Sequence, residues 1–172
     1  MLRDLIVGPH QISFDITNKC NLRCLHCYNS SGENLASQNE LTDQEVLDFI
    51  DEFKSIKLLN FCFCGGEPLL RKELIVEAAK RLRTYGCENV AMVSNGILMT
   101  DEVIEELINA GVTRIQISLD GIKAESHDRI RNKKGVYEKA TRAIEALVKH
   151  GVDTAVAFTP TSFNISELRA VR

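Results

Sequence analysis

The sequence AGVT at residues 110–113 and the sequence HGVD at residues 150–153 decide the expected fold. Each stretch leaves a helical pattern through a glycine, the residue best suited to the left-handed end of a helix, and then enters a strand pattern. Repetition of this joint is typical of successive βα units. It predicts an α/β fold with a parallel sheet and right-handed crossovers.

Strand and helix patterns alternate along the whole chain around these joints. Thr42 followed by Glu45 marks the start of the first helix as a capping box, and Asn164 with Glu167 marks the start of the last one. The strands are expected at residues 11–16, 58–64, 90–93, 115–119 and 155–158. Helices are expected from 42 to 53, from 72 to 85, from 100 to 110, around 140–148 and from 164 onward.

Composition indicates a globular domain with one core. A chain of 172 residues with 44% hydrophobic and 26% charged residues is long enough for one core and short for two. The 21 basic and 24 acidic residues form no basic stripe, so no nucleic-acid partner is expected. Apolar runs are far shorter than the roughly 18 residues of a membrane span, so no membrane partner is expected. Residues 1–10 lack a signal-peptide pattern, and we expect a cytoplasmic location.

Distinctive polar and sulfur-containing segments follow four successive strands. A group of three cysteines within residues 20–27 follows the first strand, GGEP at 65–68 the second, SNG at 94–96 the third, and SLDG at 118–121 closes the fourth. The carboxyl ends of parallel strands meet at one edge of a sheet, where ligands collect. The sequence therefore predicts a binding site that these four segments build together.

The cysteines at 20–27 are expected to hold a metal centre. Cys20, Cys24 and Cys27 supply three thiols from one short loop, and thiolates suit zinc and iron–sulfur clusters. The other three cysteines, Cys62, Cys64 and Cys87, are interpreted as small packed residues.

Zinc and an iron–sulfur cluster place different demands on this loop. A structural zinc site usually has four protein ligands. His26 is the nearest fourth ligand, but its neighbour Cys27 would have to bind the same ion, which is sterically awkward. A cubane held by three cysteines instead leaves one iron free to accept a small bidentate molecule. A non-catalytic iron–sulfur or zinc-binding module remains the alternative of another class.

The other strand ends suit a small zwitterionic ligand. Gly65 and Gly66 allow the backbone to approach a ligand closely, and Glu67 is able to accept hydrogen bonds from an ammonium group. Short groups suited to a ribose or a carboxylate, and one arginine able to pair with a carboxylate, complete the candidate site: Ser94, Asn95, Ser118 and Arg131.

Together these segments resemble the radical S-adenosylmethionine (radical SAM) superfamily. CNLRCLHCY at 20–28 matches its CxxxCxΦC signature with His26 in the aromatic position, and GGEP at 65–68 is similar to its GGE motif. The SNG, SLDG and HDRIR segments follow in the family's usual order. Within the superfamily, the residues around these motifs are most similar to those of the SPASM/twitch-type branch, which matures peptides, quinone cofactors and modified haems.

The resemblance implies a partial (β/α)6 barrel that binds a 4Fe–4S cluster and S-adenosylmethionine. Cys20, Cys24 and Cys27 would hold three irons, and the fourth iron would chelate the methionine end of the cofactor. A 5′-deoxyadenosyl radical would then abstract hydrogen from the substrate. Glu67 and the adjacent glycine backbone would hold the amino group, and His26 would lie near the adenine. Ribose and carboxylate would be held by Ser94, Asn95, Ser118 and Arg131.

The resemblance also implies partners and a larger protein. The expected substrate is a peptide or a small biosynthetic intermediate, with a modified haem or tetrapyrrole as the alternative, and the expected electron donor is a flavodoxin or ferredoxin. The five expected strands fall short of six, and relatives usually carry a cysteine-rich C-terminal extension. Residues 1–172 are therefore expected to be the core domain at the N-terminal part of a longer chain.

Overall fold

All five expected strands form, and they pair in parallel in the order of the sequence. The computed structural model describes residues 9–32, 39–56 and 58–170. In this part of the chain the strands are β1 (Gln11–Asp15), β2 (Asn60–Cys64), β3 (Asn89–Ser94), β4 (Arg114–Ser118) and β5 (Asp153–Ala157). Each strand pairs with the next one, which gives one five-stranded sheet. The α/β class and the five parallel strands are confirmed.

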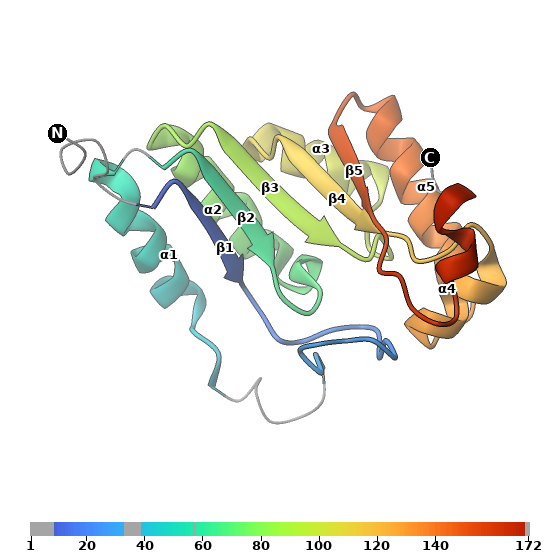
Figure 1. Cartoon of the computed structure of the whole chain (residues 1–172). Helices are drawn as coiled ribbons and strands as arrows, with labels where there is room; N and C mark the ends of the chain where they lie inside the picture. The colour runs from blue at the N-terminus through green and yellow to red at the C-terminus, as the bar shows by residue number, and fades with distance from the viewer. Residues whose placement is uncertain (1–8, 33–38, 57, 171–172) are drawn as a thin grey trace, which may run out of the picture.

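Helices connect the strands, and all but the fourth, which packs on the fifth, lie side by side against one face of the sheet (Figure 1). They are α1 (Asp43–Asp51), α2 (Lys72–Thr84), α3 (Asp101–Ala110), α4 (Ala124–Arg131) and α5 (Val136–Lys149), with 3-10 turns at η2 (Glu52–Ser55), η3 (Pro68–Arg71) and η4 (Ile165–Ala170). No helix in the described part of the chain combines the length and the apolar character of a membrane span.

Local signals in the sequence fix most helix ends. Thr42 and Glu45 form the expected capping box at the start of α1, because each side chain bonds the other residue's backbone N–H. Thr100 caps α3 with its hydroxyl, and Gly111 ends that helix in the left-handed conformation (φ +94°).

Three helical expectations need correction. The helix α4 is not among the expected helices, because its residues are almost all polar. The last helix is a 3-10 turn, and Asn164 and Glu167 do not form a capping box at its start. The Asn164 side chain bonds residues 120, 159 and 161 instead. The Glu167 side chain accepts hydrogen bonds from Ile122 N–H and Ser126 Oγ. The helix expected around 140–148 begins earlier, as α5 at Val136, and Val148 in its last turn is 62% exposed.

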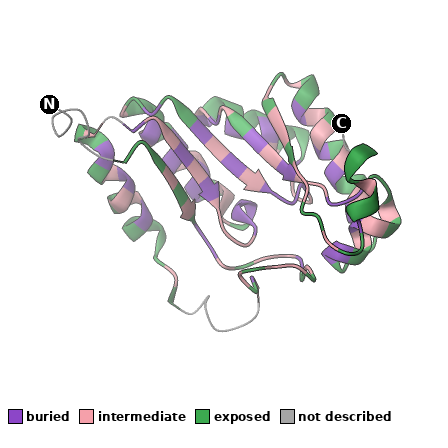
Figure 2. Cartoon of the chain, in the orientation of Figure 1, coloured by how far each residue is buried: buried purple, intermediate pink, exposed green. Residues whose placement is uncertain are grey.

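Successive residues of each strand point alternately to a buried core face and to a less buried inner face. Figure 2 shows this as buried and intermediate residues that alternate along the strands. Phe61 and Phe63 on β2 are fully buried against the helices, as are the corresponding apolar residues of β3 and β4. Cys62 and Cys64 point to the other face. Ser13 and Asp15 stand opposite them on β1 in register, so they share this inner face. Among the described residues no helix layer covers the inner face, and a ligand has room against it.

Candidate functional site

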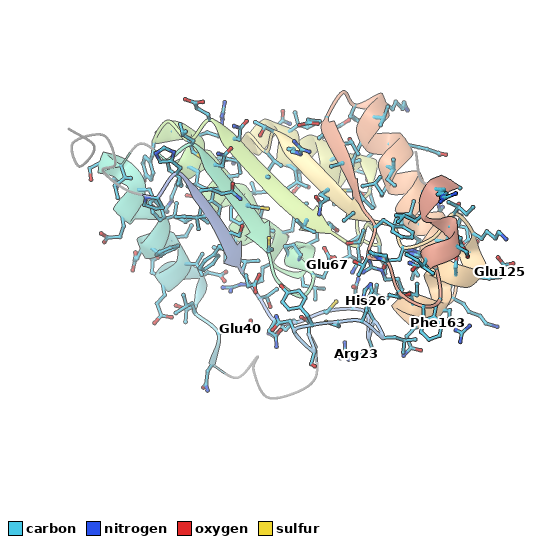
Figure 3. All side chains as sticks on the ribbon, in the orientation of Figure 1. Arg23, His26, Glu40, Glu67, Glu125 and Phe163 are labelled. Atoms are coloured by element: carbon cyan, nitrogen blue, oxygen red, sulfur yellow. The ribbon has the colours of Figure 1, made fainter. Side chains whose placement is uncertain are left out.

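The loop after β1 brings the three clustered cysteines to the carboxyl edge of the sheet. We call residues 16–32 the thiol loop. Glu40 fixes its start by accepting hydrogen bonds from Thr17 Oγ1 (3.0 Å) and Asn18 N–H (2.6 Å). Arg23 closes it by donating to the carbonyls of Cys20 and Leu22 and to the carbonyl of Gly32 at its far end. Figure 3 shows Glu40 and Arg23 at this loop.

Gly65 and Gly66 are required by the thiol loop itself. A Cβ on Gly66 would lie 2.2 Å from the Lys19 carbonyl oxygen, and one on Gly65 would lie 2.3 Å from that of Thr17. The close approach allows Gly66 N–H to bond Thr17 O and Glu67 N–H to bond Lys19 O, both at 2.8 Å. From the sequence, these glycines are expected to allow close contact with a ligand. In the structure they also permit close contact between two backbones.

One cavity of about 380 Å³ collects most of the expected site residues. The thiol loop, the ends of β2, β3 and β4, and α4 all contribute to it, as predicted for the carboxyl edge of a parallel sheet. Of the residues expected from sequence it is lined by Cys20, Cys24, His26, Cys27, Gly65, Gly66, Ser94, Asn95, Ser118 and Arg131. Glu67 is the one expected site residue that does not line it.

The three thiols differ in how readily they ionise. Burial raises the pKa of Cys20, and it raises the pKa of Cys24 although Arg131 Nη1 lies 3.7 Å from the Cys24 sulfur. Burial also opposes ionisation of Cys27, but backbone N–H groups led by those of Ser31 and Asn29 hold the pKa of its thiol below the ordinary value. Cys27 is therefore the thiol best prepared to act as a thiolate.

The donor set fits an extended sulfur-ligated centre better than a single ion. Among the described residues, no three His, Cys, Asp or Glu side chains converge closely enough to hold one metal ion. A closed zinc site with Cys20, Cys24, Cys27 and a fourth ligand would require that convergence. A cubane needs the three sulfurs farther apart, because each binds a different iron. Cys20, Cys24 and Cys27 all line one cavity, so a centre that they share would lie there.

Glu67 holds the end of β3. Its side chain is fully buried, and Oε1 accepts from Ser94 Oγ (2.9 Å) and Leu69 N–H (3.2 Å) while Oε2 accepts from Asn95 N–H (2.9 Å). Burial raises the pKa of this carboxyl. Glu67 thereby sets the positions of Ser94 and Asn95, which do line the cavity. Its expected contact with the cofactor's ammonium group stays a prediction.

Asp120 organises the opposite side of the cavity, and the sequence analysis did not single it out. Its fully buried carboxylate lies 2.7 Å from Arg131 Nη2 and 2.8 Å from His26 Nε2, and it accepts from Thr159 N–H at 2.9 Å. Burial alone would raise the pKa of Asp120, but His26 and Arg131 hold it below the usual value. Its place at the end of β4, in the SLDG segment, was the available signal.

Arg131 retains unused hydrogen-bonding capacity at the cavity. Its Nε is buried and has no hydrogen-bond partner among the described residues. Leaving a buried donor unpaired costs about 1–3 kcal/mol, and more on a charged group. An anionic ligand or a water molecule in the cavity would supply the missing acceptor. This unpaired donor agrees with the expected carboxylate partner.

His127 is a structural neighbour of this group. Its Nδ1 accepts a hydrogen bond from Asp120 N–H (3.0 Å), which orders the loop between β4 and α4. Burial, together with the nearby charge of Arg131, lowers the pKa of His127 to about 4. The imidazole is therefore neutral near pH 7 and serves as an acceptor.

Cys62 and Cys64 form a close thiol pair. Their Sγ atoms are 3.5 Å apart on the inner face of β2, and both residues are half-buried. The contact lowers the pKa of Cys62 and raises that of Cys64, because one thiol donates to the other. Cys87, by contrast, is buried in the core as expected.

The family model of the radical SAM superfamily matches residues 14–171. The chain belongs to the radical SAM superfamily. Proteins of this superfamily bind a 4Fe–4S cluster and S-adenosylmethionine, so the expected family and cofactor pair are confirmed at the level of the family.

Named relatives are enzymes. The AdoMet-dependent heme synthase of Methanosarcina barkeri is 36% identical over 164 residues, which cover 94% of this chain and 45% of that protein. The mycofactocin maturase MftC of Mycolicibacterium smegmatis is 34% identical over 164 residues, covering 94% of this chain and 40% of that protein. The chain thus spans less than half the length of these relatives.

Solved structures share the fold at low identity. Streptococcus suis SuiB bound to its precursor peptide SuiA matches with a TM-score of 0.73 at 16% identity, over 96% of this chain and 37% of SuiB. The protein anSMEcpe with bound AdoMet and the Kp18Cys peptide matches with a TM-score of 0.72 at 21% identity, over 87% of this chain and 43% of that one. These likenesses support the partial-barrel architecture.

Proposed function

We propose that residues 1–172 form the radical SAM core domain of a longer chain, which cleaves S-adenosylmethionine reductively to start radical chemistry on a substrate. One observation carries the proposal: three thiols from one loop share a cavity with the ends of three parallel strands. In that arrangement, a sulfur-ligated centre and the polar groups that bind a ligand would lie in the same cavity.

Cys20, Cys24 and Cys27 are proposed as the ligands of three irons of a 4Fe–4S cluster. All three line one cavity, which also holds the ends of β2, β3 and β4. Arg131 beside Cys24 adds positive charge near the sulfurs. A cationic group near the thiolates favours their ionised form, which is the form that binds iron.

S-Adenosylmethionine is proposed to lie over the strand ends. Backbone groups at Gly65 and Gly66 suit its amino group, and Arg131 with its unpaired Nε suits its carboxylate. Glu67 supports this arrangement chiefly by holding the end of β3, in addition to its predicted contact with the ammonium group. Ribose and carboxylate contacts are assigned to three further cavity residues: Ser94, Asn95 and Ser118.

His26 is proposed to lie near the adenine. Its Nε2 is tied to Asp120, so the imidazole is held in one orientation at the cavity wall. A ring in a fixed orientation offers a flat surface to a base at little further cost in side-chain entropy.

The protein's share of the chemistry is positioning. When bound, the cluster and the sulfonium cofactor supply one-electron reductive cleavage and a carbon radical that abstracts hydrogen. The chain holds the thiol loop against Gly65 and Gly66 and keeps Arg131 aligned through Asp120. A half-enclosed site also limits the access of water and other hydrogen donors.

A peptide or a small biosynthetic intermediate is the proposed substrate, with a modified haem or tetrapyrrole as the alternative. The mycofactocin maturase and the peptide-bound structures support a peptide, whereas the heme synthase relative supports a tetrapyrrole. Isothermal titration of the full-length, cluster-loaded protein with a precursor peptide encoded beside its gene and with iron coproporphyrin III separates the two.

The proposed electron donor is a flavodoxin or ferredoxin, and the proposed location is the cytoplasm, where a reducing environment protects an open iron–sulfur centre. The donor is tested in the 5′-deoxyadenosine assay of the reconstituted protein, by replacing the strong chemical reductant, dithionite, with reduced flavodoxin.

Anaerobic reconstitution of the full-length protein tests the core proposal. We expect about four irons per chain and formation of 5′-deoxyadenosine under strong reductant. Cys24→Ser should lose most of the iron and the product, whereas the matched substitution Cys87→Ser, in the core, should keep both. A colourless protein with one tightly bound zinc would overturn the radical function. A cluster with bound cofactor but no 5′-deoxyadenosine would reduce the domain to a binding module.

A further inference from the structure

A hollow of about 690 Å³ lies between the thiol loop and α4, apart from the cavity described above. Leu25 of the thiol loop lines it and is 58% exposed. Charged residues of α4 and of the turn after it form the rest of its charged lining: Glu125, Asp128, Arg129, Lys133 and Lys134. We call it the basic hollow. The proposed radical chemistry uses none of these side chains.

Only a thin wall separates the basic hollow from the cavity of the thiol loop. Leu25 lines the hollow, whereas Cys24 directly before it lines the cavity. On α4, Arg129 lines the hollow and Arg131 lines the cavity. The two segments are joined by a hydrogen bond from Leu25 N–H to the Ile130 carbonyl oxygen (2.8 Å). A molecule in the hollow would therefore lie directly behind Cys24 and leave the cavity free for a ligand.

The hollow carries positive charge without carboxylate partners. Residues 123–134 include five basic and two acidic residues, whereas the whole chain has 21 basic and 24 acidic ones. Arg129, Lys133 and Lys134 are exposed, and none of them takes part in an ion pair within the described part of the chain. Three exposed cations on one short segment favour an anionic partner.

The two acidic residues of the hollow do not cancel this charge. The Asp128 carboxylate is directed to the start of α5, where it accepts hydrogen bonds from the N–H groups of residues 135, 136 and 137. There it compensates the positive end of that helix. Glu125 offsets one of the three cations, so the hollow keeps an excess of positive charge.

Arg129 is held in place before any partner arrives. Its guanidinium carbon lies 4.1 Å from the centre of the Phe163 ring, in a cation–π contact. Figure 3 shows Phe163 and Glu125 at the end of the molecule that carries α4. A cation that is already ordered loses little side-chain entropy on binding. An exposed leucine bordered by cations gives the hollow an apolar centre and a charged rim, as in protein–protein interfaces.

We propose that the basic hollow is the docking surface of an acidic electron-carrier protein. The proposal rests on the proposed function, because that chemistry needs one electron at the thiol loop and the hollow lies directly behind it. In this step the carrier is oxidised by one electron and the centre at the thiol loop is reduced by one, while no bond forms or breaks. Electron-transfer complexes typically bury less than about 1,200 Å², which a small charged surface is able to supply. Their charged rims chiefly govern the rate of association.

Titration of the iron-loaded, full-length protein with an acidic flavodoxin, and separately with an acidic ferredoxin, tests the proposal. The Debye length falls from about 30 Å at 0.01 M salt to about 8 Å at 0.15 M, so we expect the Kd to rise at least about fivefold. The double variant Lys133→Glu/Lys134→Glu should bind at least about tenfold more weakly at low salt, because it meets the acidic carrier with like charge. Lys80→Glu/Lys149→Glu is the matched control. It changes the net charge equally at exposed positions of α2 and α5 and should bind within about twofold of wild type.

Reduction of the cluster separates this proposal from the radical function. Reduced flavodoxin should bleach the iron–sulfur absorbance at least about tenfold more slowly in the double variant than in wild type. Dithionite needs no protein docking and should bleach both proteins to the same extent. If neither reductant bleaches wild type, the radical function fails, whereas docking is still read from the titration.

Several results would overturn the docking surface. Neither carrier binding to wild type, equal binding by wild type and the double variant, equal weakening in the control variant, or a Kd that does not respond to salt would each do so. A substrate peptide or another part of the chain seated in the hollow would give the second of these results. If circular dichroism shows that the double variant is misfolded, Lys133→Gln and Lys134→Gln replace it, each with an expected loss of about threefold in affinity.

Discussion

Arg131 at the end of α4 and Asp120 after β4 form a buried ion pair, with 2.7 Å between Nη2 and Oδ2. The pair links the fourth strand to the helix that the sequence left unpredicted, and it also reaches the thiol loop, because Asp120 bonds His26 and Arg131 approaches Cys24. One carboxylate thus aligns two side chains of the proposed cofactor site.

Removal of the charge on Asp120 should destabilise the fold strongly. Asp120→Asn leaves the largely buried Arg131 guanidinium without its anion, and breaking a buried pair in this way costs about 3–5 kcal/mol. Urea unfolding at pH 7 measures this difference. Asp153→Asn is the control, since Asp153 pairs with Arg114 at the exposed surface and should change stability by less than about 1 kcal/mol. Equal effects of the two substitutions would contradict the role of Asp120.

His127 should make the protein acid-sensitive. Its pKa is about 4 in the folded chain against 6.5 as the ordinary value, so the unfolded chain binds more protons between these pH values. The shifted pKa of His127 therefore contributes to the free energy of unfolding in full above pH 6.5. This contribution, about 3 kcal/mol, is lost as pH falls from 6.5 toward 4. His127→Asn keeps an acceptor for Asp120 N–H but does not titrate.

The pH dependence of unfolding in wild type and His127→Asn checks this prediction. The difference in unfolding free energy between them should shift in favour of the variant as pH falls from 6.5 to 4. Because acidic groups such as Asp120 titrate in both proteins, their contribution largely cancels in the difference. A difference that stays constant over this range would show that His127 is not held neutral.

Much of the site was predictable because strand ends in a parallel sheet meet at one edge. The segments at 20–27, 65–68, 94–96 and 118–121 each follow a strand, and four strand positions were enough to place them around one cavity. The same period of two puts Cys62 and Cys64, two residues apart on β2, on one face of the sheet. These predictions needed only local periodicity and the geometry of βα units.

The rest depended on contacts between distant residues. His26 and Asp120 are 94 positions apart, and Glu40 reaches back 22 positions to Asn18, so no local pattern identifies either pair. α4 escaped notice because its polar sequence gives no apolar stripe, and it is held by neighbours rather than by its own periodicity. Glu67 was expected at the ligand surface because its short motif follows a strand end. Its burial depends on how the end of β3 packs against it, and the short motif carries no information about that packing.

Gly66→Ala should disturb the thiol loop. The new Cβ would lie 2.2 Å from the Lys19 carbonyl oxygen, so the backbones must separate and the bonds of Gly66 and Glu67 N–H to the loop weaken. Two such bonds together contribute about 2 kcal/mol. We expect at least that loss in unfolding free energy, and reduced iron content after reconstitution.

Gly86→Ala provides the contrast for this substitution. Gly86 has φ +87° but nothing within 4 Å of an added Cβ, so strain of the left-handed backbone costs about 1–2 kcal/mol without any effect on the thiol loop. Its iron content should equal that of wild type. Equal iron loading of Gly66→Ala and wild type would show that the loop does not depend on this close approach.

Ser94→Ala should cost more stability at high pH than at low pH. Burial raises the folded pKa of Glu67 above its ordinary 4.5, so stability falls as pH rises from about 4.5 through the folded pKa. The Ser94 hydroxyl favours the ionised carboxylate, and its removal raises that pKa further and leaves Gly96 N–H without its acceptor. We expect a loss of about 1–3 kcal/mol that is larger at pH 8 than at pH 5. Thr141→Ala removes a half-buried hydroxyl on α5 that bonds only carbonyls of its own helix, and it should change stability little at either pH. A loss at Ser94 that is equal at both pH values would mean that the protonation of Glu67 does not change between pH 5 and pH 8, and it would contradict this prediction.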